Sequence, residues 1–256
     1  ILTIIKRKKS SKRRQMIKKA LISLSVATIL FATQGSTIQT NPLQGSINID
    51  KMVENRDIRE LEELARNNPY MADINFMIGV YYMAGDKIKN VEPNFEKAIK
   101  HLTKDENNLA MANYKIAEIY YYGGFGAKQD LEKSIQYFTK SLNQEFKDYK
   151  SVAPLSLLAI SNIYLEKLYD YEKAVPYLMR AAQEFNKVEA EMTLAFMYYE
   201  GKGILKNEIE ANYWINKAYF NKDANGDIKA YISNYIEPVN NFNIESDVKN
   251  SCGVLR

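Results

Sequence analysis

The chain has 256 residues, of which 46% are hydrophobic and 26% charged, so it is long enough to bury a sizeable core. It contains one cysteine, Cys252, which excludes an internal disulfide framework. The formal net charge is +4, but residues 1–35 carry nine Lys or Arg and no acid. Without that segment the net charge would be −5, which removes the electrostatic basis for a nucleic-acid partner.

Residues 1–35 have the pattern of an export signal. Met16, Ile17, Lys18 and Lys19 precede an apolar stretch over 20–32, which matches the charged start and short apolar core of a secretory signal peptide. The stretch is too short for a permanent transmembrane helix. We therefore expect cleavage after residue 32 or 35, and no stable membrane anchor after signal removal. A twin-arginine export signal around Arg13 and Arg14 is the alternative.

The segments that follow differ in composition. Residues 36–48 are polar and lack periodicity, which predicts a flexible linker. Ile58, Leu61, Leu64 and Ala65 then have helical spacing and predict an amino-terminal capping helix within a repeat domain over 49–237. Residues 238–256 show no sustained pattern and are expected to form a mobile tail, in which Cys252 is either inert or makes an intermolecular bridge.

One pattern occurs four times in the repeat domain. It consists of Ile or Leu, a small residue, a tyrosine and usually a glycine, followed by a small residue, an aromatic or His, an apolar residue and a basic residue. The copies are Ile78, Gly79, Tyr82, Gly85, Ala98, His101, Leu102, Lys104; Ile116, Ala117, Tyr120, Gly123, Ser134, Tyr137, Phe138, Lys140; Ile160, Ser161, Tyr164, Ala174, Tyr177, Leu178, Arg180; and Leu194, Ala195, Tyr198, Gly201, Ala211, Trp214, Ile215, Lys217. The spacing between successive copies of this pattern indicates stacked helical hairpins.

Each copy predicts two short helices, called A and B here. In helix A, the residue after Ile or Leu is small and allows a close neighbour, and the tyrosine lies one turn further on the same face. The glycine falls where helix A must stop. A single hairpin cannot bury its apolar face, so stability must come from stacking. Residues 223–236, with Ile228, Tyr231, Ile232 and Tyr235 at helical spacing, predict a closing helix.

These residues resemble the Sel1-like repeat, a relative of the tetratricopeptide repeat. The fourth copy agrees best with that signature, through Ala190, Leu194, Ala195, Tyr198, Gly201, Gly203, Ala211, Trp214, Lys217 and Ala218. The third copy lacks the glycine after Tyr164 and looks more like an ordinary tetratricopeptide hairpin. The resemblance implies an all-α fold, an α-solenoid of four repeats plus capping helices. It implies little about activity, because repeat scaffolds serve unrelated tasks.

Catalytic and metal-binding motifs are not evident in the sequence. It contains no His-Glu-x-x-His, no Gly-x-Ser-x-Gly, no phosphate-binding glycine loop and no Cys/His cluster. His101, the only histidine, occupies the helix-B aromatic position of the other copies, which favours a packed ring over a catalytic base. The chain is therefore expected not to be an enzyme and to use no metal or cofactor.

The analogy with tetratricopeptide hairpins also predicts a concave groove lined by helices A. Its lining should be aromatic and aliphatic with a few acids, the composition of a protein-binding surface. The expected partner-binding residues are Phe76, Val80, Met83, Tyr114, Glu118, Tyr121, Tyr122, Leu158, Asn162, Leu165, Glu166, Met192, Phe196, Tyr199 and Glu200. Tyr121, Tyr122, Phe196 and Tyr199 are the expected anchors. The alternative for any one of these residues is burial against the adjacent helix A.

The resemblance narrows the expected function to an exported protein-binding module. Small exported Sel1-like proteins of Gram-negative bacteria are often immunity proteins against phospholipase-type toxins of type VI secretion systems, which implies a periplasmic protein that occludes a lipase toxin. The alternative is a periplasmic regulator or assembly scaffold that binds a sensor or envelope enzyme. Some cysteine-rich relatives are proposed to bind penicillin or hydrolyse β-lactams, but this chain lacks their cysteine pairs and a nucleophile motif.

Overall fold

The computed structural model describes residues 58–68, 73–86, 89–107 and 109–233. The chain divides into two units, Ile1–Asn48 and Ile49–Arg256, and all described residues belong to the second. The predicted export signal, the linker and the carboxyl-terminal tail with Cys252 lie outside the described residues.

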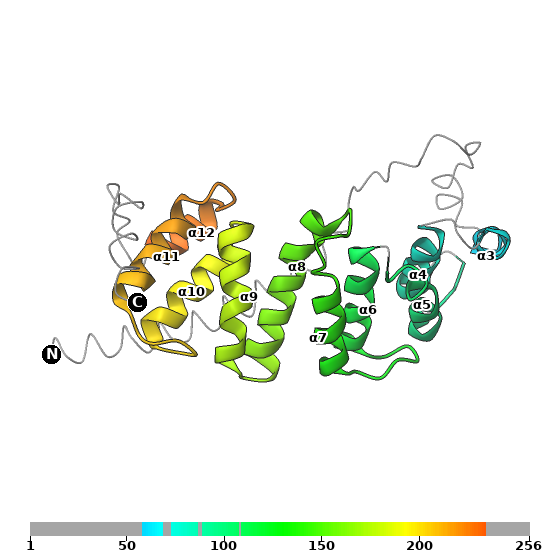
Figure 1. Cartoon of the computed structure of the whole chain (residues 1–256), viewed down its shortest axis with the longest axis horizontal. Helices are drawn as coiled ribbons and strands as arrows, with labels where there is room; N and C mark the ends of the chain where they lie inside the picture. The colour runs from blue at the N-terminus through cyan, green and yellow to red at the C-terminus, as the bar shows by residue number, and fades with distance from the viewer. Residues whose placement is uncertain (1–57, 69–72, 87–88, 108, 234–256) are drawn as a thin grey trace. The chain divides into compact units, whose positions relative to one another are not determined.

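The described part of the chain is helical and contains no β-strand (Figure 1). Its elements are α3 (Ile58–Asn67), α4 (Ile74–Ala84), α5 (Phe95–Leu102), α6 (Ala110–Tyr122), α7 (Leu131–Lys140), α8 (Tyr149–Asn162), the π-helix η1 (Ile163–Lys167), α9 (Tyr171–Glu184), α10 (Val188–Glu200), α11 (Glu208–Phe220) and α12 (Gly226–Ser233). The predicted all-α fold is confirmed.

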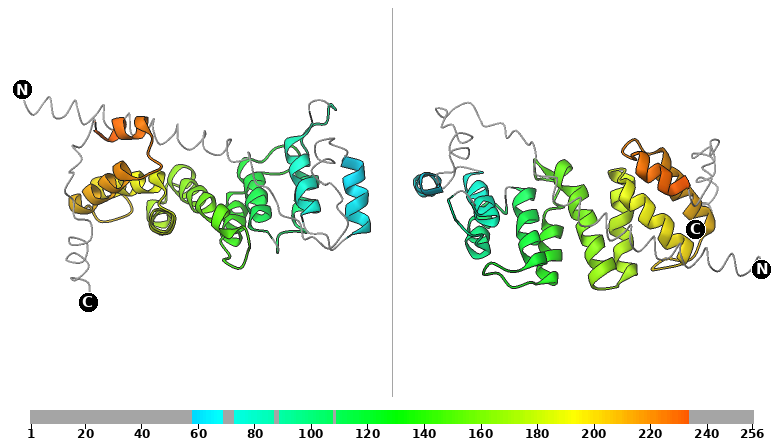
Figure 2. Two further views of the ribbon diagram at one scale, coloured as in Figure 1. Left: turned by 90° about the horizontal axis from the view of Figure 1, so that it is seen from above. Right: turned by 180° about the vertical axis from the view of Figure 1, so that it is seen from behind.

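The helices pair in the order of the predicted repeats. Helices A are α4, α6, α8 and α10, and each packs against the helix B that follows it: α5, α7, α9 and α11. Successive hairpins then touch through the pairs α5 and α6, α7 and α8, and α9 and α10 (Figures 1 and 2). Because α3 packs on α4 and α12 packs on α11, both ends of the described stack carry a capping helix.

The repeated positions of helix A form the core. Ile78, Ile116, Ile160 and Leu194 are all fully buried. The small residue beside the first of them, Gly79, leaves room for helix α5, because a Cβ atom there would lie 2.5 Å from Cγ of Leu102. The small positions are therefore set by the close approach of helices A and B within one hairpin.

The same hydrogen bonds recur at each turn from helix A to helix B. The backbone N–H of the residue that caps helix B donates to the carbonyl of the repeated helix-A tyrosine, at 2.7–3.0 Å. The four pairs are Asn94 with Tyr82, Asp130 with Tyr120, Asp170 with Tyr164, and Asn207 with Tyr198. The same Asn or Asp side chains accept a backbone N–H from the first turn of helix B. The start of helix B is thus held by the same backbone and capping contacts in all four copies.

The tyrosine of helix A also stacks on the aromatic position of helix B. The ring centroids are 6.0 Å apart for Tyr82 and His101, 5.8 Å for Tyr120 and Tyr137, and 6.0 Å for Tyr164 and Tyr177. His101 is therefore a packed ring, and burial lowers its pKa. Its Nδ1 lies 3.1 Å from Oδ1 of Asn75.

The third copy ends differently from the others. Gly85, Gly123 and Gly201 follow their helices A with positive φ, whereas α8 continues into η1 and the residue with positive φ is Tyr169, at 54°. A helix that lacks the stopping glycine runs on, and it widens into a π-turn before the chain reverses.

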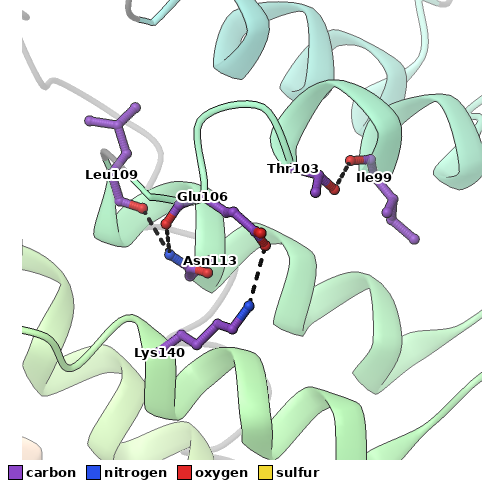
Figure 3. A network of polar contacts seen from close by, with 6 residues as sticks. All are labelled: Ile99, Thr103, Glu106, Leu109, Asn113 and Lys140. Carbon is purple, nitrogen blue, oxygen red and sulfur yellow. Dashed lines mark hydrogen bonds and ion pairs between the residues drawn. The ribbon is translucent and has the colours of Figure 1, made fainter.

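Side chains also connect successive repeats (Figure 3). Lys140 Nζ of α7 lies 3.4 Å from Glu106 Oε2, in the turn that joins repeats one and two. Asn113 Nδ2, in the first turn of α6, donates to the carbonyls of Glu106 and Leu109. The Asp148 carboxylate of repeat three accepts the N–H groups of Ala110 and Met111 and so caps α6 from outside.

Candidate partner-binding surface

The structure leaves most of the fifteen expected partner-binding residues accessible to solvent. Tyr122 and Tyr199 are exposed, at 56% and 42%. Eleven are half-buried: Phe76, Val80, Met83, Tyr121, Leu158, Asn162, Leu165, Glu166, Met192, Phe196 and Glu200. The accessible residues are called the A-helix surface below.

Tyr114 and Glu118 do not belong to that accessible set. Tyr114 is 5% exposed and packs edge-on against Phe138 of α7, with ring centroids 5.2 Å apart. Glu118 is 7% exposed. The facing assumed from tetratricopeptide hairpins is wrong at these two positions, because α6 also packs against α8 and covers this side of the helix.

Glu118 forms a covered ion pair beneath the surface. Its Oε2 lies 2.8 Å from Lys115 Nζ, and the two side chains are 9% and 15% exposed. Burial raises the pKa of the Glu118 carboxyl, while Lys115 and the Tyr114 hydroxyl act in the opposite direction. The Glu118 carboxylate also raises the pKa of Tyr122, after the larger effect of burial.

Tyr121 and Tyr122 form the aromatic centre of the surface on α6. Their rings meet edge to face with centroids 4.9 Å apart. The π-helix brings two residues of repeat three to this place, because Lys167 Nζ lies 5.7 Å from the Tyr121 ring centroid and Glu166 raises the Tyr121 pKa after the larger effect of burial. The surface is thus continuous from α6 to η1.

Lysines over the aromatic rings are the feature that the sequence analysis missed. On the A-helix surface, ammonium groups lie 5.2–5.7 Å from the ring centroids in the pairs Lys167 with Tyr121, Lys202 with Phe196, and Lys206 with Tyr199. Lys115 lies in the same way over the buried ring of Tyr114, at 5.5 Å. Each such contact contributes about 0.5–1 kcal/mol at an exposed site. The only sequence signal was the placement of three of these lysines just after the ends of helices A. The A-helix surface therefore carries basic groups over its aromatic rings, whereas the sequence analysis expected only acids beside them.

The core covers some apolar side chains of helices A only in part. Helix α4, with the sequence INFMIGVYYMA, buries Ile74 and Ile78 and leaves Phe76, Val80 and Met83 half-buried. Of these, Phe76 and Met83 pack against the core of the first repeat. Helix α7, LEKSIQYFTK, is polar on its outer face. Helices A therefore keep partly accessible apolar side chains, although α4 and α6 each contact helices on more than one side.

Two further properties limit the chemistry of the described residues. No group of three or more His, Cys, Asp or Glu side chains among them could hold a metal ion. Within the same residues, no helix has the length and apolar character needed to cross a membrane.

The antiparallel helix pairs, stacked in sequence order, define an α-solenoid repeat protein. The Sel1 repeat family matches residues 73–104, 110–146 and 188–219, which contain the first, second and fourth hairpins. Three of the four hairpins thus match the Sel1 repeat. The third hairpin, with its π-helix, falls between the matched segments.

Two solved structures are similar to this chain. One is c5321, a protective antigen present in uropathogenic Escherichia coli strains that displays an SLR fold, with 22% identity over 63% of this chain and 32% of that one, and a TM-score of 0.48. The other is a Sel1 repeat protein from Oxalobacter formigenes, with 18% identity over 70% of this chain and 60% of that one, and a TM-score of 0.33. This chain thus spans about a third of the first structure. No curated protein matches the sequence.

Proposed function

We propose that this chain is a non-enzymatic binding module and that a partner protein contacts its A-helix surface. Sel1 repeats typically mediate protein–protein interaction. The observation that carries the proposal is the group of aromatic side chains near the ends of α6 and α10, where Tyr121, Tyr122, Phe196 and Tyr199 keep solvent access. Aromatic side chains of this kind dominate the energetics of protein interfaces.

The narrower form of the proposal is an exported immunity protein. The predicted export signal and the resemblance to exported Sel1-like proteins support it. In this form the A-helix surface occludes the active site or the membrane-docking face of a lipase toxin delivered into the periplasm. A periplasmic regulator that binds a sensor or envelope enzyme would use the same surface.

A capture experiment tests the general proposal. The full chain is used as bait in cells of its source, beside Tyr121→Ala/Phe196→Ala and beside Phe220→Ala. Phe220 is a matched control, because it is an exposed aromatic on a helix B, at 51%. We expect the same partner with the wild type and the control but not with the double variant. Retention of every captured protein by a folded double variant, shown by circular dichroism, contradicts the proposal.

A survival experiment tests the narrower form. Cells that receive the lipase toxin in the periplasm should survive with the exported wild type or Phe220→Ala, and should die with Tyr121→Ala/Phe196→Ala. A chain without residues 1–35 should also fail, because it would not meet the toxin. Death of cells that contain the exported wild type, combined with capture of a sensor or an envelope enzyme, would favour the regulatory role.

A further inference from the structure

Helix α12 has the sequence pattern and the place of a fifth helix A. Its Ile232 lies 38 residues after Leu194, and the buried Ile or Leu residues of the earlier copies are 34–44 residues apart. Ile232 is 1% exposed and shares a buried cluster with Val188 of α10 and Ala218 of α11. Helix α6 likewise packs on both helices of the hairpin before it, α4 and α5. A further repeat thus begins after the four complete ones.

One face of α12 is open where the complete copies are covered. The small residue after the buried Ile or Leu is itself buried in all four complete copies, as Gly79, Ala117, Ser161 and Ala195. The corresponding Ser233 of α12 is exposed. Helix B covers this position elsewhere: a Cβ atom at Gly79 would lie 2.5 Å from Cγ of Leu102, and Ser134 Oγ donates to the carbonyl of Ala117 at 2.9 Å. No helix follows α12 among the described residues, so its helix-B face is free to receive one.

Residues 247–256 carry the pattern of a helix B. Counted from its capping Asn or Asp, each helix B has a small residue four positions on and an apolar residue eight positions on. The four sets are Asn94, Ala98, Leu102; Asp130, Ser134, Phe138; Asp170, Ala174, Leu178; and Asn207, Ala211, Ile215. Asp247, Ser251 and Leu255 repeat the set. Ser251 lies 19 residues after Ile232, and the same interval is 14–20 residues in the complete copies. The match is visible only in this alignment, so periodicity alone predicted a mobile tail.

Two positions that touch in the complete copies change together in the fifth. The helix-A tyrosine stacks on the ring of helix B in repeats one to three. The corresponding residues of the fifth copy are Ile236, four positions after Ile232, and Val254, seven positions after Asp247. Both are aliphatic, so each suits the other, whereas a single ring would lack its stacking partner. Pro238 stands one position before the place of the stopping glycines, where a proline also ends a helix.

We propose that residues 247–256 dock on the open face of α12 as the helix B of a fifth repeat. The connection is long enough, because Asp247 follows Ile236 by 11 residues and the same interval is 6–12 residues in the complete copies. The tether raises the effective concentration of this segment at α12 above that of any separate chain. Docking covers Ser233 with Ser251 and Leu255 and closes the carboxyl end of the stack to other proteins, a second copy included.

Two cysteine pairs test the docking in the full chain. Both variants carry Cys252→Ser and Ser233→Cys; one adds Leu255→Cys and the other Val248→Cys. Positions 233 and 255 correspond to Gly79 and Leu102, which touch, whereas position 248 lies about two turns earlier on helix B. In a glutathione buffer the 233–255 disulfide should be at least about fivefold more abundant than the 233–248 disulfide, because the bond needs Cβ atoms about 3.5–4.5 Å apart.

An undocked segment would favour the shorter loop, which is the one closed by 233 and 248. Equal yields, or an excess of the 233–248 disulfide, therefore overturn the proposal. Disulfide-linked dimers also overturn it, because they would show that a second copy covers the open face of α12.

Amide hydrogen exchange of α12 gives a second readout. Leu255→Asp puts a carboxylate where the corresponding Leu102, Phe138 and Leu178 are buried. Exchange in 226–233 should become at least about fivefold faster, because α12 loses its cover. Lys249→Asp is the matched control, since the corresponding Glu96, Glu132 and Glu172 are exposed, and it should leave the rates within about twofold. If α12 exchanges in Leu255→Asp as it does in the wild type and the control, the segment does not cover α12 and the proposal is wrong.

Discussion

At the scale of single residues, Gly203 lies in a close contact between repeats three and four. Its φ is +68°, and a Cβ atom there would lie 2.4 Å from the carbonyl carbon of Tyr171, in the backbone of the preceding repeat. Because backbone cannot move aside as a side chain can, we expect Gly203→Ala to lower the free energy of unfolding by about 2 kcal/mol or more. Urea denaturation measures this change.

Gly124 provides the matched control for that prediction. It is also left-handed, with φ of +91°, but a Cβ atom there would meet no atom within 4 Å. Gly124→Ala should therefore cost only the backbone conformation, about 1 kcal/mol. Equal losses in the two variants would mean that contact with Tyr171 does not matter.

Glu191 should make stability depend on pH. Its side chain is fully buried, with Lys217 Nζ 3.3 Å from Oε1 and Asn221 Nδ2 2.8 Å from Oε2. Burial raises its pKa above the ordinary value of 4.5, although Asn221 and Lys217 act the other way. The folded state therefore holds this proton more tightly than the unfolded state does. Its contribution to stability is full below pH 4.5 and is lost as the pH rises through the raised pKa.

Glu191→Gln tests this sign directly. The amide cannot ionise, so the variant should lose less stability than the wild type as the pH rises from below 4.5 to 7. The comparison is the difference between two series of urea unfolding curves, which cancels the other titrating groups, His101 included. Two parallel series would show that the Glu191 pKa is the same in the folded and unfolded states.

At the scale of elements, the sequence pattern was enough to predict helices A and B and both caps. Ile or Leu followed by a small residue and, one turn later, by tyrosine has a single low-energy arrangement, a helix packed closely on its neighbour. The pattern did not predict η1. The absence of a glycine after Tyr164 indicates that the helix continues, but it does not indicate that the continuation is a π-helix. The Asn and Asp caps at 94, 130, 170 and 207 were visible in the sequence as a recurring signal and were overlooked.

The turn after η1 carries a prediction of its own. Asn tolerates the left-handed conformation of residue 169 much better than tyrosine does, and the Tyr169 side chain is 71% exposed, so little packing is lost. Tyr169→Asn should therefore raise the free energy of unfolding by up to about 1 kcal/mol. A clear destabilisation in urea would show that the ring makes contacts that support the turn.

At the scale of the whole molecule, the sequence predicted the fold better than the binding surface. The fold could be predicted because four copies of one pattern each indicate the same helical hairpin. The surface depends on how far apart successive helices A lie, which no single copy encodes. Tyr114 and Glu118 were misplaced for this reason, because α6 approaches α8 closely. The basic groups over the rings were missed because they come from turns outside the helix-A pattern.

The affinity of the captured partner for the full chain tests the central claim most directly. Isothermal titration should compare the wild type with Tyr122→Ala/Tyr199→Ala, which removes two exposed rings of the A-helix surface, and with Phe220→Ala. We predict that the double variant binds at least about thirty-fold more weakly, since truncating an interfacial aromatic anchor costs about 2 kcal/mol, and that the control stays within about twofold. A folded double variant that binds its partner with wild-type affinity would contradict the assignment of the A-helix surface.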